Sequence, residues 1–337
     1  MKKIQPLKAE KLLQRLTLPT GRIRMVLDTD TYNEIDDQFA VVHALLSPER
    51  LAVEAIYAAP FYNHLANTPG HGMALSFEEI GRLLDRLNLS ADGFAFRGSA
   101  GFLDDYDHPL KSEAVNDLIS RAMGAADDNP LYVVAIGALT NIASAILLEP
   151  EIIHKIVLVW LGGTALHWPH AFEFNLEGDV LASRLIFDCG VPLVMVPCTG
   201  VTTHLHTTVP EIDKHVLGKG DIGDFLAVRF KAYSDDHFGW SKEIWDIAPI
   251  AYLINSSWLP SNIVSSPILT QRTPADIRKL QSAGWHEGEL MWSFDPGRHP
   301  IRYIYHLQRD PIFRDLFTKL EHYASGLIKP RRFSITP

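Results

Sequence analysis

The sequence predicts an α/β fold, namely an open, mostly parallel, twisted sheet flanked by helices. Short apolar runs rich in β-branched residues alternate along the chain with stretches of helical periodicity, which is typical of a parallel sheet. The runs do not alternate polar with apolar residues, as expected of strands covered on both faces. They lie at residues 24–27, 51–59, 131–136, 156–161 and 191–197.

Helices are expected between these strands, because apolar residues recur there with helical spacing. Pro48 and Pro150 follow two of these stretches and Gly190 ends a third, so each has a natural stop. Ser76 and Glu79 have the spacing of a capping box and predict a further helix that begins near Ser76. The other predicted helices cover residues 36–47, 139–147, 179–189, 248–255 and 311–326.

The length and composition are those of a globular protein, with 337 residues, 47% hydrophobic and 21% charged. We expect one domain over residues 1–337, with an N-terminal amphipathic arm at 1–20. Residues 199–245 are rich in His, Asp and aromatic residues and are predicted to form an irregular or helical insertion over the active site. The edge of the sheet below that insertion, where the strands end, is the expected place of the site.

The net charge and the number of cysteines indicate which classes of binding partner and which cellular compartment to expect. A formal net charge of -9 argues against a nucleic-acid polymer as partner. No apolar run is long enough to cross a membrane, so no membrane partner is expected. Cys189 and Cys198 lie in apolar surroundings, and we interpret both as core residues. Two thiols do not make a disulfide framework, so we expect a reducing cytoplasm.

A cluster of acidic residues follows the first predicted strand. Five acids occur within ten residues, namely Asp28, Asp30, Glu34, Asp36 and Asp37. Carboxylates gathered at a sheet edge repel one another unless a cation neutralises them, and calcium accepts six to eight oxygen ligands. The plainer interpretation is a solvated acidic loop in which Asp36 or Asn33 caps the next helix. The position directly after a buried strand favours the cation site.

This run resembles the N-terminal signature of the nucleoside hydrolases, the inosine-uridine preferring family, in which a D-x-D pair is followed by D-D. Three further segments resemble later motifs of that family in the same order: residues 135–143, residues 173–175 with Asp179 after them, and the pair Trp245-Asp246. Together they span Arg24 to Leu253. The resemblance implies a Rossmann-related sheet and an enzyme that hydrolyses the N-glycosidic bond of ribonucleosides, releasing free base and ribose, in nucleoside salvage.

The resemblance also implies a calcium site. Asp30, Asp37 and Asp246 would be its side-chain ligands, and the main-chain carbonyl of Ile136 a further ligand. Asp30 would in addition be the general base that activates the attacking water. Asp28 would support the site from a buried position.

The ribose site follows in the same way. Asp36, Glu173 and Asn175 would bind ribose hydroxyls. Asn63 stands where the family has an asparagine, although the preceding loop differs. His167 falls where many members have an asparagine for the 5′-hydroxyl. The loop between Asp30 and Asp36 is two residues longer than is usual.

Trp245 departs from many members, which have a histidine at this position to protonate the leaving base. An indole is no general acid near neutral pH, but it can stack on a base, and stacking favours the larger purine ring. The resemblance therefore predicts a purine preference, with Trp245 as a simple core residue as the alternative. His237 in the insertion is a candidate lid residue or leaving-group acid. The resemblance further implies a homo-oligomer, a dimer or a tetramer.

Three other interpretations compete. Residues 26–31 fit the D-x-D-x-T signature of a haloacid dehalogenase-type phosphohydrolase, with Asp28 and Asp30 acting with magnesium. That enzyme needs a later lysine and a further acidic pair at strand ends, which the sequence lacks. A non-catalytic nucleoside-binding protein is the second alternative. His204 and His206 have the alternation of zinc ligands on a strand, but no nearby Cys or Glu completes the set.

Overall fold

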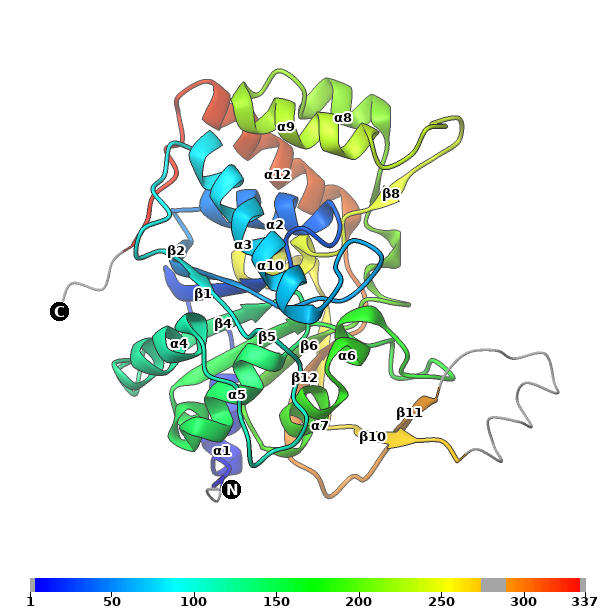
Figure 1. Cartoon of the computed structure of the whole chain (residues 1–337). Coiled ribbons are helices and arrows are strands. Elements are labelled where there is room, and N and C mark those ends of the chain that lie inside the picture. Colours follow the sequence, from blue (N-terminus) through cyan, green and yellow to red (C-terminus); the bar gives the residue numbers. More distant parts are fainter. Residues whose placement is uncertain (1–3, 274–288, 334–337) are drawn as a thin grey trace.

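The computed structural model describes residues 4–273 and 289–333 and is built on one large sheet (Figure 1). The sheet has eight strands in the order β3-β2-β1-β4-β5-β6-β12-β9. All neighbouring strands are parallel except β9, which runs antiparallel to β12. The predicted α/β class is therefore confirmed.

The strands of the large sheet are β1 (Ile23–Thr29), β2 (Leu51–Ala58), β3 (Ala95–Arg97), β4 (Leu131–Ala135), β5 (Ile156–Leu161), β6 (Leu193–Val196), β9 (Ser261–Ser265) and β12 (Pro300–Ile304). Every residue of β2, β4, β5 and β6 is buried. This burial on both faces explains their unbroken apolar sequences. Two small antiparallel sheets add β7 (His206–Thr207) with β8 (Lys242–Glu243), and β10 (Ile268–Gln271) with β11 (Leu290–Ser293).

Helices cover both faces of the sheet. In Figure 1, α2, α3, α10 and α12 lie above it with α8 and α9 beyond them, and α4, α5 and α7 lie below it. Their bounds are α1 (Ala9–Arg15), α2 (Asp36–Leu45), α3 (Pro69–Arg86), α4 (Glu113–Met123), α5 (Thr140–Leu148), α6 (Phe174–Gly178), α7 (Val180–Asp188), α8 (Val209–His215), α9 (Gly220–Lys231), α10 (Ile247–Ile254) and α12 (Arg309–Ala324). Short 3-10 turns occupy Pro150–His154, Thr202–His204 and Ser256–Trp258.

The predicted elements are confirmed with one correction. The five expected strands are β1, β2, β4, β5 and β6, and the five helices predicted from apolar spacing are α2, α5, α7, α10 and α12. The capping box at Ser76 and Glu79 is wrong, because α3 begins at Pro69 and Thr68 caps it. Both residues are instead buried inside the helix, where Glu79 accepts a hydrogen bond from Gln38 at 2.6 Å.

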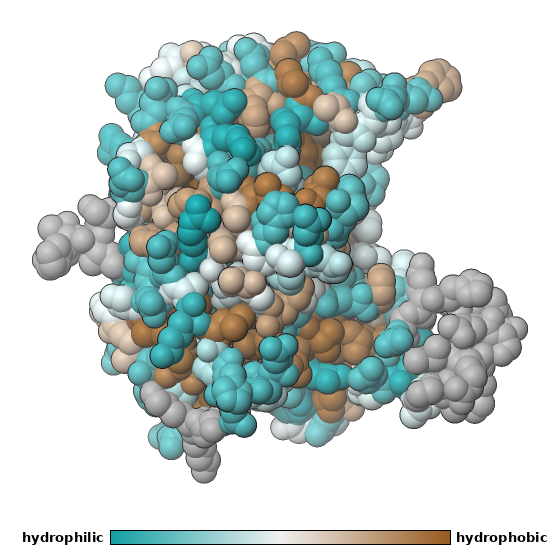
Figure 2. Space-filling view, viewed as in Figure 1, coloured by the Kyte–Doolittle hydropathy of each residue, from teal (hydrophilic) through white to brown (hydrophobic). Residues whose placement is uncertain are grey.

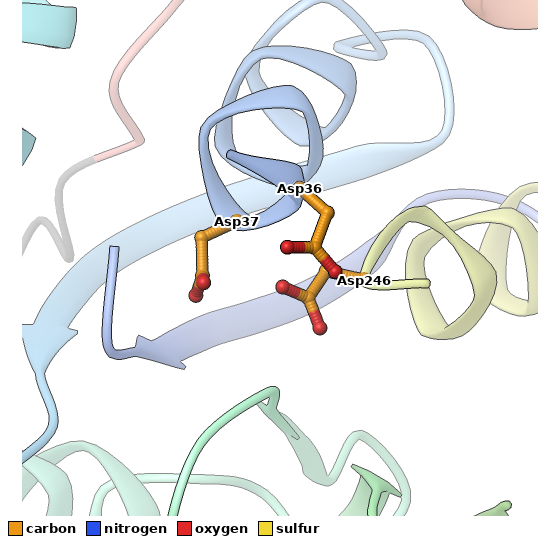
Figure 3. A group of neighbouring side chains, drawn as sticks. All are labelled: Asp36, Asp37 and Asp246. Atoms are coloured by element: carbon orange, nitrogen blue, oxygen red, sulfur yellow. The ribbon is translucent and has the colours of Figure 1, made fainter. Parts of the chain in front are cut away.

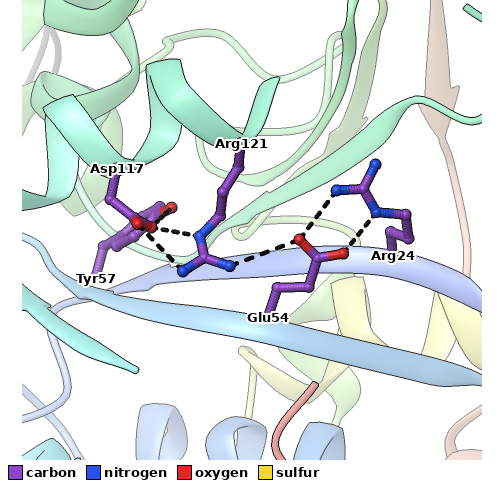
Figure 4. A network of polar contacts seen from close by, with 5 residues as sticks. All are labelled: Arg24, Glu54, Tyr57, Asp117 and Arg121. Atoms are coloured by element: carbon purple, nitrogen blue, oxygen red, sulfur yellow. Dashed lines mark hydrogen bonds and ion pairs between the residues drawn. The ribbon is translucent and has the colours of Figure 1, made fainter. Parts of the chain in front are cut away.

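A polar network attaches α4 to the sheet (Figure 4). Glu54 of β2 lies between two guanidinium groups, with Arg24 Nε at 2.6 Å and Arg121 at 3.7 Å. Arg121 also pairs with Asp117, which accepts a hydrogen bond from the Tyr57 hydroxyl at 2.7 Å. The charges are mostly shielded from water but each has a partner, which offsets their cost of burial. Through Tyr57, which pairs in register with Asp28 of β1, the network reaches the carboxyl end of the sheet.

The segment 199–245 is more regular than its composition suggests. It contains α8, α9 and the β7–β8 pair, and Figure 1 shows the loop between α9 and β8 projecting from the upper part of the molecule. The surface in Figure 2 is mostly hydrophilic, with apolar patches in its middle and lower part. Within the described ranges no helix is long and apolar enough to span a bilayer.

Candidate active site

The site lies where the strand order reverses. From β1 the chain proceeds outward to β2 and β3 on one side, and β4, β5 and β6 continue on the other. Loops after β1 and β4 therefore diverge to opposite faces and leave a crevice at their carboxyl ends. Asp28 belongs to β1 and Asp30 directly follows it, while Ile136 follows β4. The Ile136 N–H donates to the Asp28 carbonyl at 2.9 Å, which joins the two strand ends.

Three buried carboxylates converge above this crevice. Asp36 and Asp37 open α2, Asp246 precedes α10, and oxygens of all three lie within 4.8 Å of one another. Figure 3 shows the side chains pointing toward one another. The positive ends of two helix dipoles face this group, which favours negative charge there. The Thr29 hydroxyl donates to Asp37 Oδ1 at 2.5 Å and fixes that carboxylate.

Asp30 lies beside this trio and is almost fully buried. A Cβ on Gly137 would lie 3.0 Å from Asp30 Oδ1, so a larger residue there would press on the Asp30 carboxylate. Asp30 Oδ2 is buried and has no hydrogen-bond partner among the described residues. A buried polar oxygen without a partner calls for an explanation, and a bound cation or a water supplies one.

The electrostatics of the cluster are unfavourable without a cation. Burial raises the pKa values of Asp30, Asp37 and Asp246, and the neighbouring carboxylates raise them further. Burial raises the pKa of Asp36 to about 6, although Lys242 opposes the shift. Four carboxyl groups that all resist ionisation in one place form a site that a divalent cation would relieve.

Asp28 lies beneath the cluster and is completely buried. Its Oδ2 accepts a hydrogen bond from the Asn141 amide at 2.8 Å. Burial raises its pKa to about 7. A carboxyl in this position is out of contact with solvent, and the geometry suits support of the site rather than attack on a substrate.

Glu173 and Asn175 contact the ends of β4 and β5. Glu173 caps α6, because its carboxylate accepts the backbone N–H groups of Asn175 and Leu176, each at 3.1 Å, and that of Gly163 at 2.7 Å. Burial raises its pKa to about 7. The Asn175 amide donates to the Leu161 carbonyl at 3.0 Å and to the Ile136 carbonyl at 3.4 Å. Both residues are thus fixed before any ligand arrives.

Cys198 is buried as predicted, but it also belongs to this site. Its thiol hydrogen-bonds Glu173, and burial together with Glu173 and Asp246 raises the pKa of the thiol well above its usual value. The apolar sequence around Cys198 predicted a core residue and gave no sign of this contact.

Asn63 and His167, the two other residues predicted to bind ribose, differ in their surroundings. The Asn63 amide donates to Asn33 Oδ1 at 2.7 Å, and Asn33 N–H donates to the Asp30 carbonyl at 2.7 Å, so Asn63 is joined to the acidic loop. His167 is exposed, and its ring meets the edge of Trp168 with centroids 6.1 Å apart.

Trp245 is partly buried and is covered on one side by a cation that the sequence did not reveal. Lys242 Nζ lies 4.1 Å from the centroid of the Trp245 ring and 2.6 Å from Glu34 Oε2. Burial alone would lower the pKa of Lys242, but Asp36 and Glu34 raise it above its usual value. Glu34 belongs to the lengthened loop, so the longer loop provides a partner for this buried lysine.

The histidine pair does not form a metal site. Among residues 4–273 and 289–333, Asp36, Asp37 and Asp246 are the one group of three or more ligand side chains close enough to hold an ion. His204 stacks on His306 and its Nε2 contacts the Leu307 carbonyl at 3.1 Å, while His206 pairs with Glu243.

A parallel sheet with a buried carboxylate cluster at its switch point, able to hold a metal ion, is an arrangement that suits metal-assisted hydrolysis. The chain belongs to the nucleoside hydrolases, since the profile of the inosine-uridine preferring nucleoside hydrolase family matches residues 25–293. It is thus a hydrolase that acts on N-glycosidic bonds of ribonucleosides.

Relatives and solved structures agree with this family. The chain is 27% identical to a probable uridine nucleosidase 2 of Arabidopsis thaliana, over 64% of this chain and 71% of the relative. It is 28% identical to a non-specific ribonucleoside hydrolase, RihC, of Salmonella paratyphi B, over 70% and 79% respectively. A purine-preferring ribonucleoside hydrolase from Gardnerella vaginalis has the same fold, with a TM-score of 0.69, 18% identity, and coverage of 90% of this chain and 99% of that one.

The phosphohydrolase interpretation is overturned by this family assignment. The structure gives a physical reason, because the Asp28 nucleophile that it requires is fully buried and hydrogen-bonded to Asn141. The D-x-D-x-T pattern at the end of β1 reflects the same need for carboxylates at a strand end in two different chemistries.

Proposed function

We propose that this protein is a calcium-dependent ribonucleoside hydrolase with a preference for purine nucleosides. The observation that carries the proposal is the buried trio of Asp36, Asp37 and Asp246. Asp30 lies beside this trio, and one of its oxygens has no partner among the described residues. The relatives include enzymes named as non-specific, as pyrimidine-specific and as purine-preferring, so they do not determine the base preference of this chain. The proposed purine preference rests on Trp245.

The donor set fits calcium. Asp30, Asp37 and Asp246 offer carboxylate oxygens, and the main chain of Ile136 offers a carbonyl oxygen at the end of β4. All are hard oxygen donors, and their number and flexibility suit calcium better than smaller cations. When bound, the ion would lower the pKa of a water molecule and accept the ribose hydroxyls as ligands.

Different residues of this chain then have different roles in the reaction. Asp30 removes a proton from the attacking water, whose oxygen forms a bond to C1′. The bond from C1′ to the base nitrogen breaks, and the base leaves with the electron pair and takes up a proton. Asp36 and the fixed Glu173 and Asn175 hold the ribose hydroxyls. The surrounding carboxylates stabilise the positive charge that develops on the ribose ring.

A panel of purine and pyrimidine ribonucleosides, assayed by release of free ribose with and without chelator, tests the function. We expect turnover of ribonucleosides, inosine or guanosine ahead of uridine, and loss of turnover in chelator. Tight nucleoside binding without release of ribose would establish the non-catalytic alternative.

Calcium should stabilise the fold more at high pH than at low pH. Burial raises the pKa of Asp28 to about 7 and that of Asp36 to about 6, so the folded, metal-free chain binds more protons than the unfolded chain. The resulting destabilisation is full above those folded-state pKa values and shrinks steadily as the pH falls from them toward the ordinary value of 3.8. We expect the metal-free melting temperature to rise from about pH 8 to about pH 5. Saturating calcium should raise it by about 5 °C or more near pH 8, with a smaller gain at low pH.

Thermal unfolding in chelator and in calcium over this pH range measures both trends. Asp37→Asn is the matched variant, because it removes one proposed ligand without changing the size of the side chain, and its calcium-dependent gain should largely vanish. Equal melting temperatures with and without calcium near pH 8, together with full activity in chelator, would remove calcium from the proposal.

Trp245→Ala should damage purine turnover more than pyrimidine turnover. One face of the indole is covered by Lys242, so a base can stack on the other face only. Loss of a base–aromatic stack costs about tenfold in kcat/KM for inosine. Trp245→Phe is the control and should retain most of the preference. A wild-type enzyme that prefers uridine, with a harmless Trp245→Ala change, would contradict the stacking.

The surroundings of His237 do not favour its role as the proton donor to the leaving base. Its ring is exposed, and its Nε2 contacts the Lys231 carbonyl at 3.0 Å. If His237 protonates the leaving base, the His237→Ala change should lower kcat by about a hundredfold.

We further propose a single domain over the whole chain, with 199–245 as its active-site insertion, and a cytoplasmic homo-oligomer, a dimer or a tetramer. Light scattering of the purified protein measures the oligomeric state.

A further inference from the structure

Several large aromatic side chains gather on the surface beside the site. Tyr62, Phe172 and Phe174 are 59%, 46% and 43% exposed. With Phe61 and Phe102 they line one cavity of about 280 Å³. Exposed aromatic residues that converge on a single cavity mark a binding site more often than chance placement does.

The cavity adjoins the proposed ribose site through its walls. Tyr62 directly precedes Asn63, and Phe172 and Phe174 flank Glu173. Its floor includes Ala138, which follows Gly137, the residue in contact with Asp30. Three segments of the lining therefore also carry a proposed sugar or metal residue, which places the cavity next to the proposed ribose site.

The geometry of a ribonucleoside determines which end enters the cavity. The base on C1′ and the C5′ group on C4′ are attached on the two sides of the ring oxygen and point apart. Trp245 lies against Lys242 of β8, whereas the cavity is formed by segments after β2 and β4 and by α6. With the base against Trp245, C5′ is directed to the opposite wall.

We propose that this aromatic cavity binds the substituent on C5′ and that the substrates include ribonucleosides with an apolar 5′ group. This inference rests on the proposed function. Five aromatic rings are a poor environment for a bare hydroxymethyl group and a good one for an alkyl or alkylthio group.

The one carboxyl group of the cavity agrees with an uncharged ligand. Glu177 lies at the cavity, and burial, followed by Glu173 and Glu289, raises its pKa to about 7. Among the residues that the structure describes, the lining contains no lysine, arginine or histidine. A 5′-phosphate would find no cation there and two nearby carboxyl groups, so 5′-nucleotides are excluded.

The test compares adenosine, 5′-deoxyadenosine and 5′-deoxy-5′-methylthioadenosine as substrates. We expect kcat/KM for the methylthio compound to exceed that for 5′-deoxyadenosine by about tenfold, the usual effect of a small apolar group in a pocket that fits it. Phe172→Ala and Tyr62→Ala should bring this ratio close to one, and Phe172→Leu should retain part of it. Phe294→Ala, an exposed aromatic residue outside the cavity lining, is the matched control and should leave the ratio unchanged.

The outcomes separate this inference from the proposed function. An enzyme that cleaves adenosine but rejects the methylthio compound overturns the inference and leaves the function intact. An enzyme that cleaves none of the three, nor inosine or uridine, overturns both. If Phe172→Ala changes the molecular mass by light scattering and lowers kcat/KM equally for all substrates, the aromatic cluster is a contact between two copies of the chain and the inference fails.

Discussion

Replacement of Asp30 by asparagine is expected to lower kcat by on the order of a thousandfold or more. The change keeps the shape of the side chain but removes the general base and a proposed metal ligand together. The loss should appear with every ribonucleoside, because Asp30 acts on the water and not on the base. Ribose release under saturating substrate and calcium measures it.

The same variant should keep its fold and gain stability without metal. Asp30 is buried among carboxylates that raise its pKa, so a neutral amide relieves their repulsion. Metal-free thermal unfolding near neutral pH should show a higher melting temperature than wild type. Asp85→Asn, at an exposed position of α3, serves as the control and should change neither activity nor stability. Turnover within about tenfold of wild type would show that another group activates the water.

2′-Deoxynucleosides are expected to be cleaved at least about a hundredfold less efficiently than ribonucleosides, measured as kcat/KM. Asp36 is buried at the start of α2 and is proposed to bind a ribose hydroxyl. A substrate that lacks the hydroxyl leaves the buried carboxylate unpaired, and this penalty is larger than the loss of one hydrogen bond. Adenosine and 2′-deoxyadenosine differ in this group alone and form the matched pair.

Asp36→Ala provides the second arm of this experiment. Without the carboxylate the penalty for the deoxy compound should shrink, so the ratio of the two kcat/KM values should fall. Equal rates for adenosine and 2′-deoxyadenosine in the wild-type enzyme would contradict the assigned ribose site. An unchanged ratio in Asp36→Ala would move the 2′-hydroxyl contact to another residue.

The central strands were predictable because they are buried on both faces and must be continuously apolar. The same rule fails toward the sheet edges. β3 has only three residues, one of them exposed, and β9 is at least partly exposed throughout, so neither has a distinctive pattern. The start of α3 has a local signal in Thr68 and Pro69, but the spacing of Ser76 and Glu79 imitates a cap where both residues are buried by tertiary contacts.

The candidate site divides in the same way. The aspartates and the segment 173–175 are recognisable because their order along the chain reflects the order of strand ends. The ion pair of Lys242 with Glu34 joins residues 208 positions apart, and neither residue has a local pattern that predicts the other. The contact of Cys198 with Glu173 and the convergence of Tyr62, Phe102 and Phe172 likewise depend on how distant loops meet. Spacing along the chain identifies a motif within one segment. Contacts between side chains from different loops can be found only from the folded structure.

Glu173 has a consequence for how this enzyme can change over evolutionary time. The carboxylate that is proposed to hold the sugar also starts α6 and accepts the Gly163 N–H after β5. A substitution of Glu173 that suits a new substrate would also remove the hydrogen bonds that hold the start of α6 and the loop after β5. The neighbouring Phe172 and Phe174 are close to half exposed, and a phenyl ring has no oxygen with which to accept the backbone N–H groups that Glu173 binds. Divergence in substrate range is therefore free to proceed through the aromatic positions on either side, while the acid between them stays fixed by the architecture it maintains.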